Sequence, residues 1–139
     1  METIKKSGNS FILRLDAGDE FISAAQDFCT QNDIKAAWLQ ALGSTKELEL
    51  AYFNLEKKDY DVSAFIEFLE VMAITGNIAL KDGKPFCHAH GVFGRADMTT
   101  IGGHVVRCVV SATMEVSLRV LEGEMNREFD EATNLHLLK

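Results

Sequence analysis

The stretch IALKDGKPFCHAHGVF, residues 78–93, decides the fold of this chain. Its centre, Lys81-Asp82-Gly83-Lys84, carries the Asp-Gly pair that is typical of a two-residue β-hairpin turn. Apolar residues continue on both sides of the turn, so we expect residues 78–80 and 86–93 to lie in two paired antiparallel strands. The hairpin therefore makes an antiparallel sheet the basis of the architecture.

The chain outside this hairpin divides into one helix and several strands. Residues 19–31 are expected to form the helix, because Phe21, Ala25 and Cys29 repeat at helical spacing on one face. Asp16 or a neighbouring residue is the expected cap of its N-terminus. Further strands are expected at residues 10–15, 47–54 and 104–120, and polar loops at residues 57–61 and 95–100.

Residues 34–42 leave two interpretations open. The segment is apolar and is bounded by Gly43-Ser44, and its periodicity does not distinguish a strand from a second short helix. In both cases the order is a strand, one main helix and then a run of strands. This order predicts the α+β class, with a single domain in which one helix packs on a mainly antiparallel β-sheet.

Length and composition limit the class of protein further. A chain of 139 residues with 47% hydrophobic and 25% charged residues is typical of one globular domain. We expect its core at about residues 8–121, followed by a charged and loosely ordered tail at residues 122–139. The sequence shows no apolar run of about 18 residues and no signal peptide, so we expect a cytoplasmic protein without a membrane span.

Charge and cysteine usage bear on partners and compartment. The net charge of −7, from 14 Lys and Arg against 21 Asp and Glu, disfavours DNA as a partner unless the basic residues cluster. Cys29, Cys87 and Cys108 are far apart and odd in number, which does not suggest a disulfide framework or a thiolate zinc site. We expect all three to be small buried apolar residues.

His88-Ala89-His90 is the most informative motif for chemistry. Two residues that are two apart on a strand point to the same face, so the two imidazoles would lie side by side. His104 begins the next expected strand, and antiparallel pairing across the connection would bring it near His90. Three neutral imidazoles favour a divalent metal ion, most of all Zn²⁺, and leave a fourth position open for water or substrate.

Other interpretations of these polar residues stay open. The histidines could be packed or hydrogen-bonded residues without a metal, and His136 is expected at the surface. Glu67 and Glu70 have opposite strand parity, so only one of them can face a metal, and both could instead lie at a rim or pair with arginines. Motifs for phosphate or nucleotide cofactors, a nucleophile elbow and an AT-hook are absent from the sequence.

The spacing of His88-Ala89-His90, Gly102-Gly103-His104 and a following valine-rich strand resembles the plants and prokaryotes conserved (PPC) domain. That family is also called domain of unknown function 296, or the PD1-like DNA-binding domain. Further likeness comes from three segments: Leu13-Arg14-Leu15-Asp16-Ala17-Gly18-Asp19-Glu20, Trp38-Leu39-Gln40-Ala41-Leu42-Gly43-Ser44 and Phe68-Leu69-Glu70-Val71-Met72-Ala73-Ile74-Thr75-Gly76-Asn77. The resemblance spans about residues 8–121.

The resemblance implies an α+β fold, assembly into homotrimers and a metal site at His88, His90 and His104. The family's DNA-binding label comes largely from plant members with AT-hooks, and those members commonly lack the histidines. The fold is further similar to that of acetolactate decarboxylase, a three-histidine zinc enzyme. This last likeness is an analogy of fold and site only.

Three hypotheses follow for function. The first is a trimeric metal-binding protein of this family that also binds DNA, through Lys57, Lys58, Lys81, Lys84, Arg95 and Arg107 if these gather on one face. The second is a metal-dependent enzyme acting on a small carboxylic acid, with Glu70 as acid or base and Arg14 gripping the carboxylate. The third is a trimeric module that presents a surface to another protein.

Overall fold

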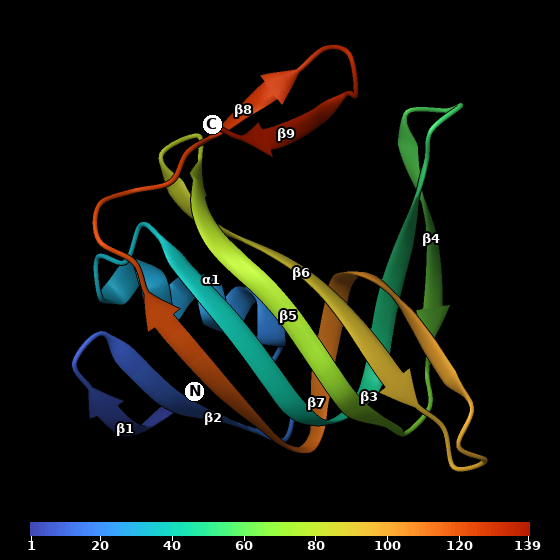
Figure 1. Ribbon diagram of the computed structural model, residues 1–139. Helices are drawn as coiled ribbons and strands as arrows, with labels where there is room; N and C mark the ends of the chain where they lie inside the picture. The colour runs from blue at the N-terminus through green and yellow to red at the C-terminus, as the bar shows by residue number, and fades with distance from the viewer.

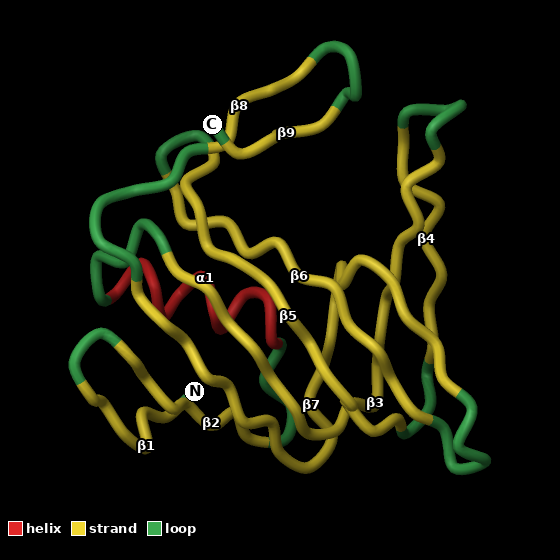
Figure 2. The backbone as a smooth tube through the Cα atoms, in the orientation of Figure 1, coloured by secondary structure: helices red, strands yellow, loops and turns green.

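The computed structural model describes residues 1–139 and is built from β-strands with one helix (Figures 1 and 2). The helix α1 is Phe21–Gln31. The strands are β1 Glu2–Ser7, β2 Ser10–Asp16, β3 Ala37–Asn54, β4 Asp59–Phe65, β5 Leu69–Lys81, β6 Lys84–Gly94, β7 Thr100–Val120, β8 Arg127–Asp130 and β9 Leu135–Leu138. The α+β prediction is confirmed, with a mainly antiparallel sheet and a single helix.

Seven strands form one antiparallel sheet in the order β1-β2-β7-β6-β5-β3-β4, and β7 pairs with β3 as well. Because β7 meets both β6 and β3, the strands β3, β5, β6 and β7 form a closed cycle of pairings. The edges of the sheet are therefore left to β1 and β4, which lie outside this cycle. The β5–β6 turn lies at Asp82 and Gly83, both with positive φ, as the Asp-Gly pair predicted.

The helix α1 packs its stripe of Phe21, Ala25 and Cys29 into the core against β6 and β7. Its N-cap is Glu20 and not Asp16: the Glu20 carboxylate accepts from the backbone N–H groups of Ile22 and Ser23. The same carboxylate accepts from the N–H of Cys108 on β7 at 3.1 Å. One acidic side chain thus caps the helix and ties it to the strand that carries His104.

The segment with two open interpretations belongs to a strand. β3 runs without interruption through Gly43-Ser44, where the sequence suggested a boundary, and its pairing with β5 and β7 shifts register there. Gly43 has a φ of 151°, and a Cβ at this position would lie 2.3 Å from the Thr113 carbonyl oxygen. Glycine therefore allows a bulge that turns two expected segments into one long bent strand.

Two expectations about the chain were wrong in detail, and one strand was not predicted. The expected polar loop at residues 57–61 is only the tip of a hairpin, because β4 already begins at Asp59. The first residues form the fully exposed edge strand β1, which has no apolar pattern to reveal it. Residues 122–139 are not a loose tail: they contain the antiparallel pair β8–β9, which stands apart from the main sheet (red in Figure 1).

The remaining expectations about burial are met. Cys29, Cys87 and Cys108 are buried free thiols in the core, and burial raises the pKa of Cys29 and Cys87 to about 12.

The one helix has 11 residues and is not long and apolar enough to cross a membrane.

Candidate metal centre

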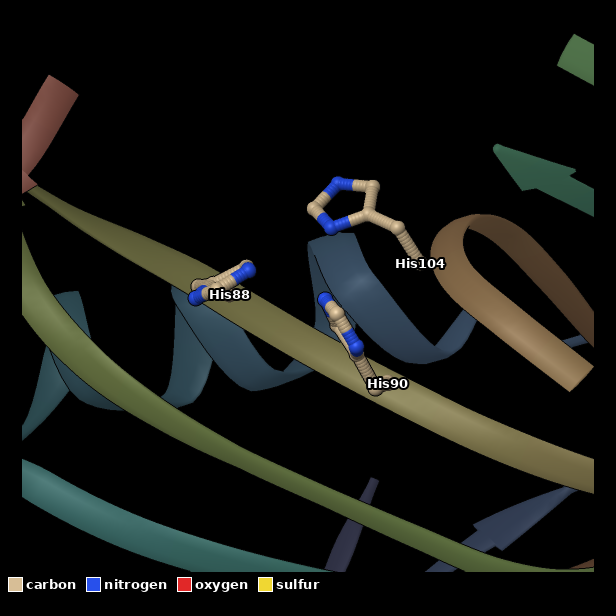
Figure 3. Close-up of side chains that lie close together, drawn as sticks. All are labelled: His88, His90 and His104. Carbon is tan, nitrogen blue, oxygen red and sulfur yellow. The ribbon is translucent and has the colours of Figure 1, made fainter. Parts of the chain in front are cut away.

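Three histidines from two neighbouring strands point toward one another (Figure 3). His88 and His90 project from β6, and His104 projects from β7. One ring nitrogen of each lies within 4.8 Å of those of the other two. His90 is exposed and the other two are half-buried. The expectation that these three residues lie together is met by this geometry.

Backbone pairing positions all three side chains. His90 lies directly opposite His104 in the β6–β7 pair, and Cys87 and Ala89 alternate with the histidines and enter the core on the other face. Gly102 lets the strands approach, because a Cβ there would lie 2.9 Å from the Gly91 carbonyl oxygen. The period of two along β6 and this close approach together bring the imidazoles to one face of the sheet.

The environment keeps two of the imidazoles neutral. Burial lowers the pKa of His88 to about 4, helped by the neighbouring His104 and by the charge of Arg127. Burial likewise lowers the pKa of His104 to about 4, with smaller contributions from His90 and Arg127. Neutral imidazole has a free lone pair, which is the form that binds a metal ion.

The donor set fits a divalent transition metal. The Nδ1 atom of His104 is buried and has no hydrogen-bond partner in the chain. A buried polar atom without a partner is costly, and a metal ion would satisfy it. Three imidazoles are a common zinc donor set, and three protein ligands leave a coordination position for water or substrate.

A pocket of about 270 Å³ opens beside this cluster. Its sides come from the tip of the β3–β4 hairpin, the β5–β6 hairpin and the β8–β9 hairpin, and His88 and His104 lie in its wall. Tyr60 from β4 packs its ring on His104, with centroids 4.9 Å apart. The cluster is thus open to a space in which a small molecule could reach a bound metal.

Sequence reasoning missed the polar residues on the far side of this pocket. Arg127, at the start of β8, lines it and donates to the side-chain oxygen of Asn77 at 2.7 Å. Asn77 is the cross-strand partner of His88. His136, expected at the surface, lines the pocket too and meets the ring of Phe129 edge to face, with centroids 5.4 Å apart. Only the pairing of β5 with β6 and the folding back of β8–β9 bring these residues together.

The two residues expected to act with the metal do not lie at this pocket. Arg14, on β2, is paired at the surface with Glu2 and Asp16, at 2.6 and 3.1 Å. Glu70 is exposed on β5 opposite Gly94 and Ser44, several residues along the strand from the partners of the histidines. Glu67 is paired with Arg95 at 2.9 Å. Within one chain, none of these three side chains lines the pocket.

Comparison with solved structures finds close relatives. A metal-containing protein from Archaeoglobus fulgidus is 34% identical, with a TM-score of 0.87 over 99% of this chain and 97% of that one. A plant- and prokaryote-conserved protein from Pyrococcus horikoshii is 30% identical, with a TM-score of 0.89 over 100% and 97%. A proposed DNA-binding protein from Bacteroides thetaiotaomicron is 27% identical, with a TM-score of 0.93 over 97% and 94%.

The likeness to acetolactate decarboxylase is confined to the fold. The enzyme from Bacillus subtilis is 14% identical, with a TM-score of 0.58 over 79% of this chain and 52% of the enzyme. No protein with a curated function matches the chain. The sequence profile of the Plants and Prokaryotes Conserved domain matches residues 2–122. With the matching fold and the histidine spacing, this shows that the chain belongs to the Plants and Prokaryotes Conserved domain family.

Proposed function

We propose that the chain binds a divalent metal ion, zinc, through His88, His90 and His104. The observation that carries the proposal is the convergence of three imidazoles within 4.8 Å on two paired strands, with the buried Nδ1 of His104 lacking a partner. A relative from Archaeoglobus fulgidus, 34% identical, is described as containing metal, which supports the same role here.

The test is metal analysis of the purified chain. Zinc is supplied at neutral pH, excess is removed by gel filtration, and the protein is measured by elemental analysis. One zinc per chain is expected, and chelator should remove it. A wild-type chain that retains no zinc under these conditions would refute the proposal and leave the histidines as packed residues.

The second candidate function is a metal-dependent enzyme acting on a small carboxylic acid. The observation that favours it is the pocket beside His88 and His104, since a zinc ion with an open position acts as a Lewis acid or activates water. The assignment of Glu70 and Arg14 to the reaction receives no support from their positions. Turnover of small oxo and hydroxy acids by zinc-loaded protein, absent after chelator, is the test.

DNA binding has weaker support. It rests on relatives that are described as proposed DNA-binding proteins. Three of the six basic residues that would have to gather on one face are instead paired with carboxylates: Lys57 with Asp61, Arg95 with Glu67 and Arg107 with Glu47. No binding of labelled duplex DNA at low salt, where phosphate contacts are strongest, would exclude this function.

We further propose that the chain assembles as a cytoplasmic homotrimer. An exposed apolar patch on the outer sheet face, formed by Ile12, Leu42 and Met72, supports burial against another subunit. Three buried, unpaired cysteines are compatible with a reducing compartment. Light scattering after gel filtration tests the assembly, and a monomeric mass would contradict it.

A further inference from the structure

Arg127 is a half-buried cation without a counter-charge. Its guanidinium donates to two neutral oxygens, the side-chain oxygen of Asn77 at 2.7 Å and the carbonyl of His136 at 3.0 Å. Its Nε–H is buried and has no acceptor, and none of the ion pairs in the chain includes it. Burying an unpaired charge is unfavourable, so a residue held in this way is suited to an anion from outside the chain.

The surroundings of Arg127 add positive charge and no compensating partner. Lys58 and Lys81 line the same pocket, and Asp59 is the one carboxylate among the lining residues. Arg127 and Lys81 both lie over the ring of Phe86. The Arg127 guanidinium carbon is 5.7 Å and the Lys81 nitrogen 5.3 Å from its centroid. In a chain of net charge −7, this pocket is therefore a local site of excess positive charge.

We propose that the pocket between the β3–β4 and β8–β9 hairpins binds a small carboxylate, with Arg127 as its anchor. The inference deepens the proposed metal function and rests on it for one contact only: the other end of the ligand would reach the open position of the metal at His88 and His104. Arg127 thus takes the role that the sequence suggested for Arg14, whose guanidinium is already paired with Glu2 and Asp16.

The shape and lining of the pocket favour a carboxylate over a phosphate. A planar guanidinium matches the two oxygens of a carboxylate, while phosphate sites commonly add a helix N-terminus or a glycine-rich loop. Neither lies at this pocket, and the aromatic rings of Phe53, Tyr60 and Phe86 offer apolar contact to a carbon skeleton. A volume of about 270 Å³ limits the ligand to a small molecule.

The test uses the full chain with pyruvate as the probe and inorganic phosphate in parallel. Each is titrated into metal-free and zinc-loaded protein while the Nε–H signal of Arg127 is followed by NMR. Pyruvate should shift this signal in both forms and bind more tightly when zinc is present. Because the signal is followed in the wild-type chain, this measurement does not depend on any variant folding.

Substitutions then locate the anchor. Arg127→Gln should weaken pyruvate binding about tenfold. Arg127→Lys should weaken it less, because the lysine ammonium keeps the positive charge although it lacks the planar, two-pronged guanidinium. Lys81→Gln, which removes a pocket charge without touching the Asn77 bond, should weaken it by a smaller factor. Arg14→Gln is the matched control, since it removes a surface arginine outside the pocket, and should leave the affinity unchanged.

The possible failures are distinguishable. A chain that binds no zinc but still shows the pyruvate shift at Arg127 refutes the metal proposal and supports the anion site. A chain that binds zinc but shows no pyruvate shift at Arg127 in either form overturns the anion site alone. Tighter binding of phosphate than of pyruvate overturns the assignment to a carboxylate.

Discussion

The histidine cluster and the C-terminal hairpin β8–β9 face the same pocket but are held in place in different ways. His90 and His104 are each paired with a neighbouring strand on both sides, and His88 is paired with Asn77 of β5. The C-terminal hairpin meets the rest of the chain at few points. They include a bridge between Leu80 and Asn126, a 2.7 Å bond from the Leu80 N–H to the Met125 carbonyl, and the bond of Arg127 to Asn77. The turn of the hairpin adds a 3.1 Å bond from the Asn134 side chain to the Lys58 carbonyl in the β3–β4 turn.

This difference separates the two proposed contacts of a ligand. Backbone register fixes the metal ligands, so their geometry should survive most changes of side chain elsewhere. A few local bonds fix Arg127, so the anion contact should be easily loosened and could adapt to a ligand. Substitutions that affect either the histidine cluster or the C-terminal hairpin, but not both, therefore test this difference.

The largest effect is expected from removing a metal ligand. His88→Ala, His90→Ala and His104→Ala should each lower zinc affinity by more than about 100-fold, since loss of an outer-shell partner alone costs about 10- to 100-fold. His136→Ala, in the C-terminal hairpin, is the control and should keep one zinc per chain. Competition with a chromophoric chelator measures the affinities. Retention of zinc by His88→Ala together with its loss from His136→Ala would mean that the wrong ligands have been assigned.

The next effect tests whether backbone approach holds the histidine cluster. Gly76 lies opposite Ala89, and a Cβ added to it would lie 2.5 Å from the carbonyl oxygen of His88. Gly76→Ala should lower the free energy of unfolding by about 1–3 kcal/mol, because backbone cannot move aside as a side chain does. Urea denaturation measures the change.

Gly94→Ala on β6 is the control for this substitution. The nearest atoms to its Cβ would belong to the flexible side chain of Met72, at 3.2 Å. We expect a clearly smaller loss of stability than for Gly76→Ala. Equal losses in the two variants would show that close approach of β5 and β6 at His88 is not a special requirement.

The same contrast explains what the sequence could predict. The Asp-Gly turn and the period of two at His88 and His90 are local signals, and the pairing of His90 with His104 follows from joining two adjacent strands. Arg127 gives no such signal, because its partner Asn77 is 50 residues away and the strands β8 and β9 have only 4 residues each. The pairing of Arg14 with Glu2 was not predicted either, because the exposed strand β1, which supplies Glu2, has no alternating apolar pattern.

A smaller and local effect is expected from loosening the C-terminal hairpin. Asn77→Ala removes the acceptor of the charged Arg127 hydrogen bond, and such bonds contribute about 1.5–3 kcal/mol. Amide exchange in β8 and β9 should accelerate by about tenfold, while the zinc content stays at the wild-type value. Thr99→Ala, which removes a hydroxyl bond to the Asp97 carboxylate in the loop between β6 and β7, is the control and should leave this exchange unchanged. Loss of zinc from Asn77→Ala would contradict the independence of the two sides.

The smallest effect concerns the pH dependence of the metal-free chain. The pKa of His88 and of His104 falls from 6.5 to about 4 on folding. Between these values the unfolded chain binds protons that the folded chain does not, so stability is fully present above pH 6.5 and falls as the pH drops toward 4. Solvent screening of these partly buried side chains limits the contribution to roughly 1 kcal/mol each. Urea denaturation in chelator at pH 7 and pH 5 should therefore show a smaller loss for the double variant His88→Ala, His104→Ala than for wild type. His136→Ala is the control, and a double variant that loses as much stability as wild type would show that acid acts elsewhere in the chain.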